Sequence, residues 1–190
     1  MVIGKVAYII ALILQIVIRY PYRDRNPQKP GDRQEQGLLV LLTLGGLVLP
    51  FMYILTDWLA FADYQPSPGV IGLGIVVMVV GLWLFWRSHT DLGRNWSPTL
   101  EIHDDHRLVT RGVYQYVRHP MYSASWLMMI GQALLLSNWV AGLGGLIAFG
   151  LLYFVRVPKE EQMMLEQFGE QYRQYVSQTG RIFPKRGFSQ

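Results

Sequence analysis

The chain has 190 residues, of which 51% are hydrophobic and only 16% are charged, whereas roughly 25% of residues are charged in soluble domains. The mean hydropathy of +0.20 points in the same direction. No cysteine is present, which excludes disulfide bonds, thiolate metal ligands and a cysteine nucleophile. This length predicts a single domain over residues 1–190. The formal net charge is +4, so a nucleic-acid partner has to be weighed against the positions of the charges.

Five long apolar segments predict membrane-spanning helices, because each approaches the roughly 20 residues that cross a hydrocarbon core of about 30 Å. They are residues 2–18, 38–62, 70–86, 121–136 and 139–155. No small-residue cleavage signal follows the first segment, so we interpret it as a retained membrane helix and not as a signal peptide. A soluble helical bundle is disfavoured, since it would have to bury five nearly uncharged runs.

Two of these segments carry details that predict how they pack. Gly45, Gly46 and Pro50 interrupt the second segment, which a membrane helix tolerates when packed neighbours satisfy the freed backbone groups. Only Ser137 and Asn138 separate the fourth and fifth segments, which predicts a tight helical hairpin.

The positive charges predict the topology. Of the 17 Lys and Arg residues, 16 fall in the first loop, the third loop and the C-terminal region, which lie on one side if there are five spans. The positive-inside rule then places the N-terminus outside and the C-terminus in the cytoplasm. The basic character is explained by this topology and by attraction to anionic membrane lipids, and no nucleic-acid partner is expected.

The segment Asp104–Tyr122 is the most polar stretch next to a predicted span. It ends in Arg118-His119-Pro120-Met121-Tyr122, and proline favours the first turn of a helix. A helix beginning at Pro120 places His119 near the positive end of the helix dipole, where a ligand oxygen is favoured. The alternative is an interfacial histidine with a tyrosine that anchors the headgroup region, and both interpretations remain open.

A second polar cluster follows the fifth predicted span. Arg156 and Glu160 are one helical turn apart and can face one cavity, as ionisable residues at membrane depth commonly do. The alternative is a plain i,i+4 ion pair. Pro158 is expected to kink or restart the helix, and residues 159–178 predict an amphipathic helix that stops near Gly180.

Other patterns of chemical interest are weak. His103, His106 and His119 lack further ligands at standard spacing, so no metal is expected. Gly72-Leu73-Gly74 is a fragment of a dinucleotide fingerprint, but it lies inside an apolar span and not between a strand and a helix. From these hydropathy, charge and residue patterns, the chain is predicted to be an all-α integral membrane protein with about five transmembrane helices, a polar cytoplasmic pocket and a C-terminal amphipathic helix.

Two segments of the sequence, together with the hairpin between them, also resemble a known protein family. HRLVTRGVYQYVRHPMY, a helical hairpin and RVPKEEQMMLEQFGEQYRQYVSQTGRIFP together resemble the isoprenylcysteine carboxyl methyltransferase family, and most of all its short prokaryotic members. The likeness covers roughly residues 88–185. The combined HxLV-GVY-RHPxY block and downstream R-x3-EE and FG-x2-Y are much more specific than either part alone, whereas the first two spans match only in hydropathy.

The resemblance implies a membrane methyltransferase that uses S-adenosylmethionine. It assigns Arg156 to the carboxylate of the substrate and, with Glu160, to the catalytic site. The residues that it assigns to the cofactor are His106, Arg107, Leu108, Val109, Tyr114, His119, Pro120, Met121, Tyr122 and Glu160. A further cofactor ligand upstream of His106 has only Glu101 as a candidate.

These residue types suit O-methylation. A carboxylate is ionised at neutral pH and needs no general base, and the fork of an arginine binds both of its oxygens. The expected acceptor is a prenylcysteine-like or other lipophilic carboxylate, from a lipidated protein or a small molecule. The alternatives are a phospholipid or amine N-methyltransferase, a non-catalytic lipid-binding membrane protein and, more remotely, an NADPH-dependent reductase.

Overall fold

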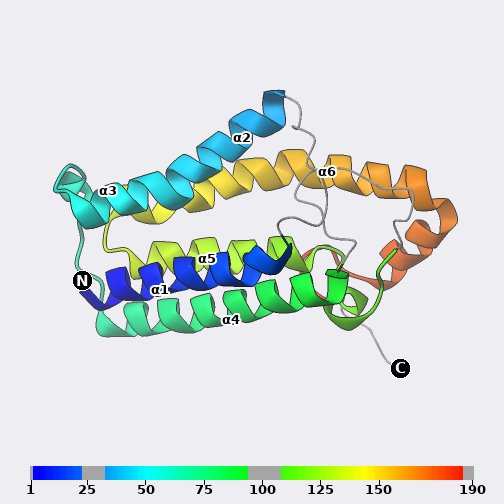
Figure 1. Cartoon of the computed structure of the whole chain (residues 1–190), viewed down its shortest axis with the longest axis horizontal. Helices are drawn as coiled ribbons and strands as arrows, with labels where there is room; N and C mark the ends of the chain where they lie inside the picture. The colour runs from blue at the N-terminus through cyan, green and yellow to red at the C-terminus, as the bar shows by residue number, and fades with distance from the viewer. Residues whose placement is uncertain (1, 23–32, 94–107, 186–190) are drawn as a thin grey trace.

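The structure is a computed structural model, and it describes residues 2–22, 33–93 and 108–185 (Figure 1). Within these ranges the only β pairing consists of two isolated bridges, one between Asp63 and Asn138 and one between Val117 and Gly180. Everything else that is regular is helical. The predicted all-α fold is therefore confirmed for the described part of the chain.

The elements form two layers around a central helix. In chain order they are α1 (Val2–Arg19), the 3₁₀ turn η1 (Tyr20–Tyr22), α2 (Arg33–Thr43), the π-helical turn η2 (Leu44–Val48), α3 (Leu49–Leu55), the 3₁₀ turn η3 (Ala60–Ala62), α4 (Pro68–Leu92), the 3₁₀ turn η5 (Gly112–Gln115), α5 (Pro120–Leu135) and α6 (Trp139–Gln178). Helix α5 packs between α4 and α6, α1 lies against α4, and α2 and α3 lie against α6 (Figure 1).

Four segments of the described chain are long and apolar enough to cross a membrane: Val2–Tyr22, Arg33–Leu55, Pro68–Leu92 and Trp139–Gln178. They contain three of the five predicted spans and most of a fourth, 38–62, whose predicted end is wrong because α3 ends at Leu55 and the chain then turns through η3. The remaining one, α5, has 16 residues and is about 24 Å long, which is less than a hydrocarbon core of about 30 Å. Pro120 begins it and the extended Leu136 ends it, so α5 is a short inner helix and not a fifth span of full length.

The outer surface of the bundle is apolar. Large hydrophobic side chains are exposed along α1 and α4, including Val2, Ile3, Val6, Ile10, Ile13, Ile16, Val17, Leu73, Val76, Val79, Val80 and Trp83. A helix that faces water carries polar residues on its outer side, whereas a helix that faces lipid does not need them. The long apolar helices and this surface together identify an integral membrane protein.

The rod formed by α2, η2 and α3 passes through the glycines that interrupt the second predicted span. The π turn at η2 frees backbone carbonyls, and side chains of neighbouring helices satisfy them. Gln132 donates to the Gly45 carbonyl at 3.0 Å, and the Tyr8 hydroxyl donates to the Gly46 carbonyl at 2.5 Å. A side chain on Gly45 would overlap the backbone of Gly144 on α6, so the small residues let the helices touch. The expected satisfaction of these groups is confirmed.

The connections of the bundle gather at opposite ends, as the charge pattern predicts. The Asn138 side chain donates to the Leu59 carbonyl at 2.6 Å and to Asp63 at 2.7 Å, and the Tyr64 amide donates to the Ser137 carbonyl. The α3–α4 connection and the α5–α6 turn therefore share one end. The C-terminal ends of α1 and α4 and the N-terminal ends of α2 and α5 lie at the other end (Figure 1).

Helix α6 is the longest element and differs from the prediction. It has 40 residues and runs through Pro158 without ending. The break comes later, at Gly169, whose φ of 50° lies in the left-handed region that glycine tolerates. The helix ends at Gln178, capped by the Thr179 amide, and Gly180 joins the bridge to Val117 instead of serving as a left-handed stop.

Because α6 extends well beyond the roughly 20 residues that a membrane requires, its two parts lie in different surroundings. The apolar part, residues 139–157, suits the membrane. Residues 158–178 project past it, at the end of the bundle where α5 begins (Figure 1).

Candidate functional site

The candidate site lies where α5 begins, and this helix starts at Pro120 as the sequence predicts. His119 is the N-cap residue of α5, with φ −124° and ψ 60°, and only 6% of it is exposed. Its amide donates to the Arg181 carbonyl at 3.0 Å, and the Arg118 amide donates to the Gly180 carbonyl at 2.8 Å. The Ser123 hydroxyl donates to the Ile182 carbonyl at 2.7 Å. The C-terminal segment thus closes the start of α5 from outside.

The turn η5 holds Tyr114 in place through a glycine. Gly112 has a φ of 62° and lies against Asp91, whose carboxylate a side chain at this position would overlap. Asp91 accepts a hydrogen bond from the Val113 amide at 2.9 Å and pairs with Arg87 at 3.1 Å. This pair at the C-terminal end of α4 therefore fixes the direction in which η5 leaves.

Tyr114 is buried between α4 and the last turns of α6. Its hydroxyl donates weakly to the Ser88 carbonyl at 3.4 Å, and its carbonyl accepts from the Tyr175 hydroxyl at 2.6 Å. Burial, and next the negative charge of Glu160, hold the pKa of the Tyr114 hydroxyl well above its usual value. Tyr114 is consequently neutral and acts as a hydrogen-bond donor.

Tyr122 and Glu160 meet across α5 and α6. The Tyr122 hydroxyl donates to Glu160 Oε2 at 2.8 Å, and the Tyr122 ring stands edge-on to the His119 ring with centroids 5.6 Å apart. Three residues that the sequence singles out are thereby brought together in space. In the described part of the chain Glu160 accepts no other hydrogen bond, so it retains acceptor capacity for a cationic group.

The neighbouring acid, Glu161, makes many more contacts. It accepts from Arg118 Nη2 at 3.1 Å and from Arg181 Nε at 3.1 Å, pairs with Arg181 through a second nitrogen, and lies 3.3 Å from His119 Nε2. Arg118 also donates to the Thr179 carbonyl at 2.5 Å. Glu161 therefore ties the start of α5 to the C-terminal segment.

The charge of Glu161 is strongly stabilised. This residue lies beyond the apolar part of α6, and 16% of its side chain is exposed. Burial raises its pKa, but the hydrogen bonds from His119 and Arg181 outweigh that effect and hold the pKa at about 2. Glu161 is thus ionised at every physiological pH.

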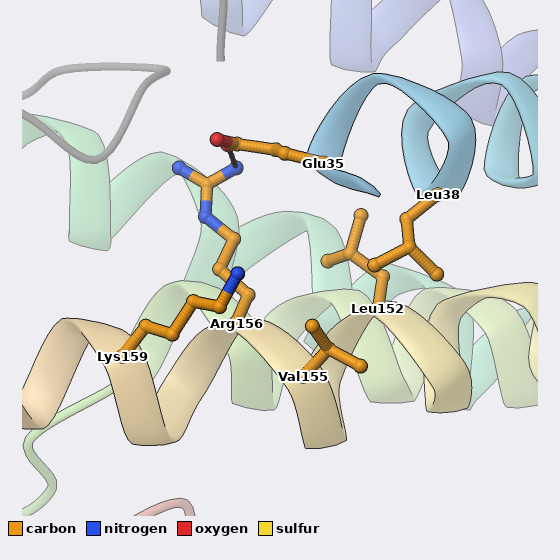
Figure 2. Close-up of a pocket in the computed structure, with 6 residues that line it drawn as sticks. All are labelled: Glu35, Leu38, Leu152, Val155, Arg156 and Lys159. Carbon is orange, nitrogen blue, oxygen red and sulfur yellow. Dashed lines mark ion pairs between the residues drawn. The ribbon is translucent and has the colours of Figure 1, made fainter. Parts of the chain in front are cut away.

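Arg156 contacts helix α2, whereas Glu160 contacts helix α5. Its Nη1 lies 3.1 Å from Glu35 Oε1 on α2, with 14% and 11% of the two side chains exposed (Figure 2). The i,i+4 pair with Glu160 that the sequence allowed is not formed. Arg156 and Glu35 border a hollow that Leu38, Leu152, Val155 and Lys159 complete. The volume of this hollow is about 10 Å³, which is room for about one water molecule.

The remaining predicted cofactor residues are more dispersed. Leu108 and Val109 are half-buried in the non-helical segment that leads into η5. Pro120 is buried at the first position of α5, and Met121 beside it is half-buried. The predicted ligands His106 and Arg107, and the candidate Glu101, lie outside the described residues.

The structure also adds partners that the sequence did not indicate. Glu35 and Arg181 are each distant in sequence from the residue with which they pair. Arg118 was already part of the RHPMY motif, but its pairing with Glu161 was not predicted. Among the described residues no group of three His, Cys, Asp or Glu side chains is arranged to hold a metal, and His103 and His106 fall outside them.

The donor set suits the cofactor that the resemblance implies. S-adenosylmethionine carries an ammonium group, which Glu160 is able to bind, and a sulfonium, which an aromatic face such as that of Tyr122 stabilises. Glu160 and Tyr122 lie together at the polar end of the bundle. Fold and site thus define a helical integral membrane protein whose ionisable side chains gather where α5 and α6 leave the membrane.

Comparison with known proteins shows the family to which the chain belongs. The model of the isoprenylcysteine carboxyl methyltransferase (ICMT) family matches residues 72–166, which is half of the chain. The chain therefore belongs to this family, as its residues predict. The matched range contains Tyr122, Arg156 and Glu160 but not Glu35 or Arg181.

Curated relatives agree with the family. The chain is 28% identical over 127 residues to a probable protein-S-isoprenylcysteine O-methyltransferase of Oryza sativa subsp. indica, covering 66% of each chain. It is 31% identical over 148 residues to the protein-S-isoprenylcysteine O-methyltransferase of Schizosaccharomyces pombe, covering 73% of this chain and 60% of that protein.

A solved structure is similar as well. The eukaryotic intramembrane Ras methyltransferase ICMT superimposes with a TM-score of 0.58 at 25% identity. The likeness covers 82% of this chain and 54% of that one. The chain thus spans about half to two thirds of these similar proteins, and its own activity is argued below as a proposal.

Proposed function

We propose that this chain transfers a methyl group from S-adenosylmethionine to the carboxylate of a prenylcysteine-like or other lipophilic acid. The observation that carries the proposal is the placement of Arg156 and Glu160 one turn apart on α6, with Glu160 joined to Tyr122 at 2.8 Å. Membership of the ICMT family supports it, as do the names of the curated relatives.

The proposed roles divide between the two faces of α6. Glu160 and Tyr122 bind the amino acid part of the cofactor, with Tyr114, His119, Pro120 and Met121 around it. Leu108 and Val109 contribute from the segment before η5, and His106 and Arg107 are proposed for the same surface. Both sides lie toward the polar end of the bundle, and the proposed transfer requires the methyl group of the bound cofactor to lie next to the acceptor carboxylate.

Arg156 is proposed to orient the acceptor. Its guanidinium presents two parallel donors, so it binds both carboxylate oxygens and points one of them at the reacting methyl group. When bound, the cofactor supplies a methyl group on a sulfonium, and transfer to a carboxylate oxygen yields an ester and a thioether without moving a proton. The protein then has to position and desolvate the acceptor and needs no base.

Methyl transfer by purified protein in lipid nanodiscs tests the proposal. Label from S-adenosylmethionine is followed onto an N-acetylated S-prenylcysteine, its carboxamide and an ethanolamine lipid. Arg156→Ala and Glu160→Ala should lower kcat/KM for the acid roughly 10- to 100-fold, since a hydrogen bond to a charged group contributes about 1.5–3 kcal/mol. Gln162→Ala is the matched control, because Gln162 lies on the same helix, is exposed and donates a hydrogen bond to the surface residue Glu166.

The outcomes separate the candidate functions. Transfer to the acid but not to the carboxamide supports O-methylation. Preferential transfer to the ethanolamine lipid would make the chain an N-methyltransferase, and failure to bind S-adenosylhomocysteine would leave a non-catalytic lipid-binding protein. Wild-type rates in Arg156→Ala would refute the role of that residue.

We also propose that the site faces the cytoplasm. By sequence, 16 of the 17 Lys and Arg residues fall in the first loop, the third loop and the C-terminal region, and the positive-inside rule supports a cytoplasmic C-terminus. Because the chain has no cysteine, single substitutions report sidedness. In inverted vesicles an impermeant thiol reagent should label Gln178→Cys and not Ser67→Cys, and the reverse pattern would refute the orientation.

A further inference from the structure

The guanidinium of Arg156 is already held by a carboxylate of the chain itself. Glu35 Oε1 lies 3.1 Å from Arg156 Nη1, and both side chains are largely buried. Figure 2 shows the two side chains pointing toward each other from α2 and α6 across the hollow. Glu35 thus presents Arg156 with the chemical group that the proposed acceptor would present.

The surroundings of this pair fit an amphiphile. Leu38, Leu152 and Val155 form an aliphatic wall beside the charged pair. The hollow is too small for such a ligand as it stands, so a ligand with a carboxylate at one end and an apolar stem at the other enters only when Glu35 moves away from Arg156. A prenylated or acylated acid has this character, whereas a zwitterionic headgroup does not.

The element that carries Glu35 is less deeply buried than the helix that follows it. Glu35 lies in the first turn of α2, and no residue of α2 is fully buried. In contrast, the following helix α3 buries Pro50 and Tyr53. Since less burial accompanies lower local stability, a displacement of Glu35 is easier to accommodate on α2 than it would be on α3.

We propose that Glu35 is an internal carboxylate that occupies Arg156 until the carboxylate of an acceptor displaces it. Glu35 is then a specificity-determining residue of the acceptor site. The inference rests on the proposed function, since it takes Arg156 as the acceptor-binding residue. It adds that an acceptor must compete with an anion already in place, so an uncharged ligand gains no access to Arg156.

This competition also distinguishes substrate from product. Methyl transfer turns a carboxylate with a full negative charge into a neutral ester, which accepts a weaker hydrogen bond from a guanidinium. Glu35 keeps its charge and regains Arg156. The ester gains too little from Arg156 to displace Glu35, so Glu35 holds Arg156 after the reaction and favours release of the product.

Equilibrium binding tests the inference without relying on turnover. The affinities of an N-acetylated S-prenylcysteine and of its methyl ester are measured for wild-type protein and Glu35→Gln in nanodiscs. Glu35→Gln removes the competing charge and keeps the shape, so the acid should bind about tenfold more tightly, from about 1.4 kcal/mol of lost competition. Affinity for the methyl ester should change less than about twofold.

Gln34→Ala is the matched control. Gln34 occupies the same first turn of α2 and accepts a hydrogen bond from Lys159 on α6 at 3.0 Å. Its loss therefore weakens the same α2–α6 interface without changing the charge next to Arg156. It should leave the preference for the acid unchanged. Weaker binding of the acid to Glu35→Gln would overturn the inference, because Glu35 would then orient Arg156 instead of competing for it. Equal changes for acid and ester would also overturn it.

Failure of the inference and failure of the proposed function are separate results. If Arg156→Ala binds the acid as tightly as wild type, Arg156 is not the acceptor site and the assignment of function fails. If Arg156→Ala loses the acid while Glu35→Gln binds it as wild type does, the function stands and the competition is refuted.

Discussion

Replacement of Glu161 by Gln tests whether the charge cluster at the start of α5 holds the C-terminal segment in place. The substitution keeps the size of the side chain and removes the charge that faces Arg118, His119 and Arg181. In the wild type 9% of the Arg118 side chain is exposed, so the guanidinium would be left buried beside a neutral amide.

Two arguments give the magnitude. Removing one partner of a buried ion pair costs about 3–5 kcal/mol, and the bond from Arg118 to the Thr179 carbonyl at 2.5 Å remains, which favours the lower end. The fall of the Glu161 pKa from 4.5 to about 2 corresponds to a similar cost of about 3 kcal/mol. Local opening should therefore rise by about a hundredfold.

Amide hydrogen exchange in nanodiscs measures this opening. The amides of Arg118, His119 and Gly180 bond across the bridge, and their exchange should accelerate by about that factor in Glu161→Gln. Glu170→Gln is the matched control, since Glu170 pairs with Arg173 with 83% and 67% of the side chains exposed. Such surface pairs contribute about 0–1 kcal/mol.

The same reasoning predicts a pH dependence. A carboxyl group whose pKa is lowered on folding stabilises the folded state above its unfolded pKa, and the effect is lost as the pH falls through the folded value. For Glu161 this window runs from about 4.5 down to about 2. Relative to the intrinsic exchange rate at each pH, protection at the bridge should fall across this window in the wild type and stay unchanged in Glu161→Gln. Equal exchange in Glu161→Gln and Glu170→Gln would refute the role of the cluster.

Three further substitutions have defined outcomes. Gln132→Leu leaves the Gly45 carbonyl unsatisfied inside the bundle, so the free energy of unfolding should fall by about 1–3 kcal/mol, measured by thermal denaturation in detergent. Gly112→Ala places a side chain at positive φ against Asp91, which should destabilise η5 by at least about 1 kcal/mol and accelerate exchange there. Tyr122→Phe removes the hydroxyl that donates to the acid on α6, and calorimetry should give about tenfold weaker binding of S-adenosylhomocysteine.

The sequence predicts the helices better than their ends. Hydropathy alone predicts the third span over 70–86, but α4 runs from Pro68 to Leu92. The extra turns are polar and stay helical because Arg87 and Asp91 pair at i,i+4 and because Asp91 also receives η5. A hydropathy pattern reports where lipid begins, and it carries no information on how far hydrogen bonding continues past that point.

The bend of α6 shows a second limit. Proline is the strongest breaker by local rules, yet the helix passes Pro158 and turns at Gly169. Only glycine takes the required left-handed conformation at low cost, and the turn brings Tyr172 and Tyr175 into buried positions under η5. The packing of the last turns selects the position of the bend, and such contacts are long-range.

The partners of the charged residues were the least predictable part of the site. Local spacing suggests that Arg156 pairs with Glu160, but it pairs with Glu35, and Glu160 takes Tyr122 instead. Residues at i and i+4 share a helix face only approximately, and here α2 lies on one side of α6 and α5 on the other. Helix packing therefore decides between partners that local spacing leaves equal.

The proposed donor side and acceptor side of the site differ in whether the family model covers them. The proposed methyl-donor side, with Tyr122 and Glu160, lies inside residues 72–166, which the family model matches. Glu35 and Leu38 lie outside that range, on α2, and line the hollow beside Arg156. A protein that keeps the first set and varies the second retains the chemistry and changes the acceptor. The acceptor preference of this chain should accordingly follow α2, and exchanging residues 33–43 between family members should transfer that preference while binding of S-adenosylhomocysteine stays the same.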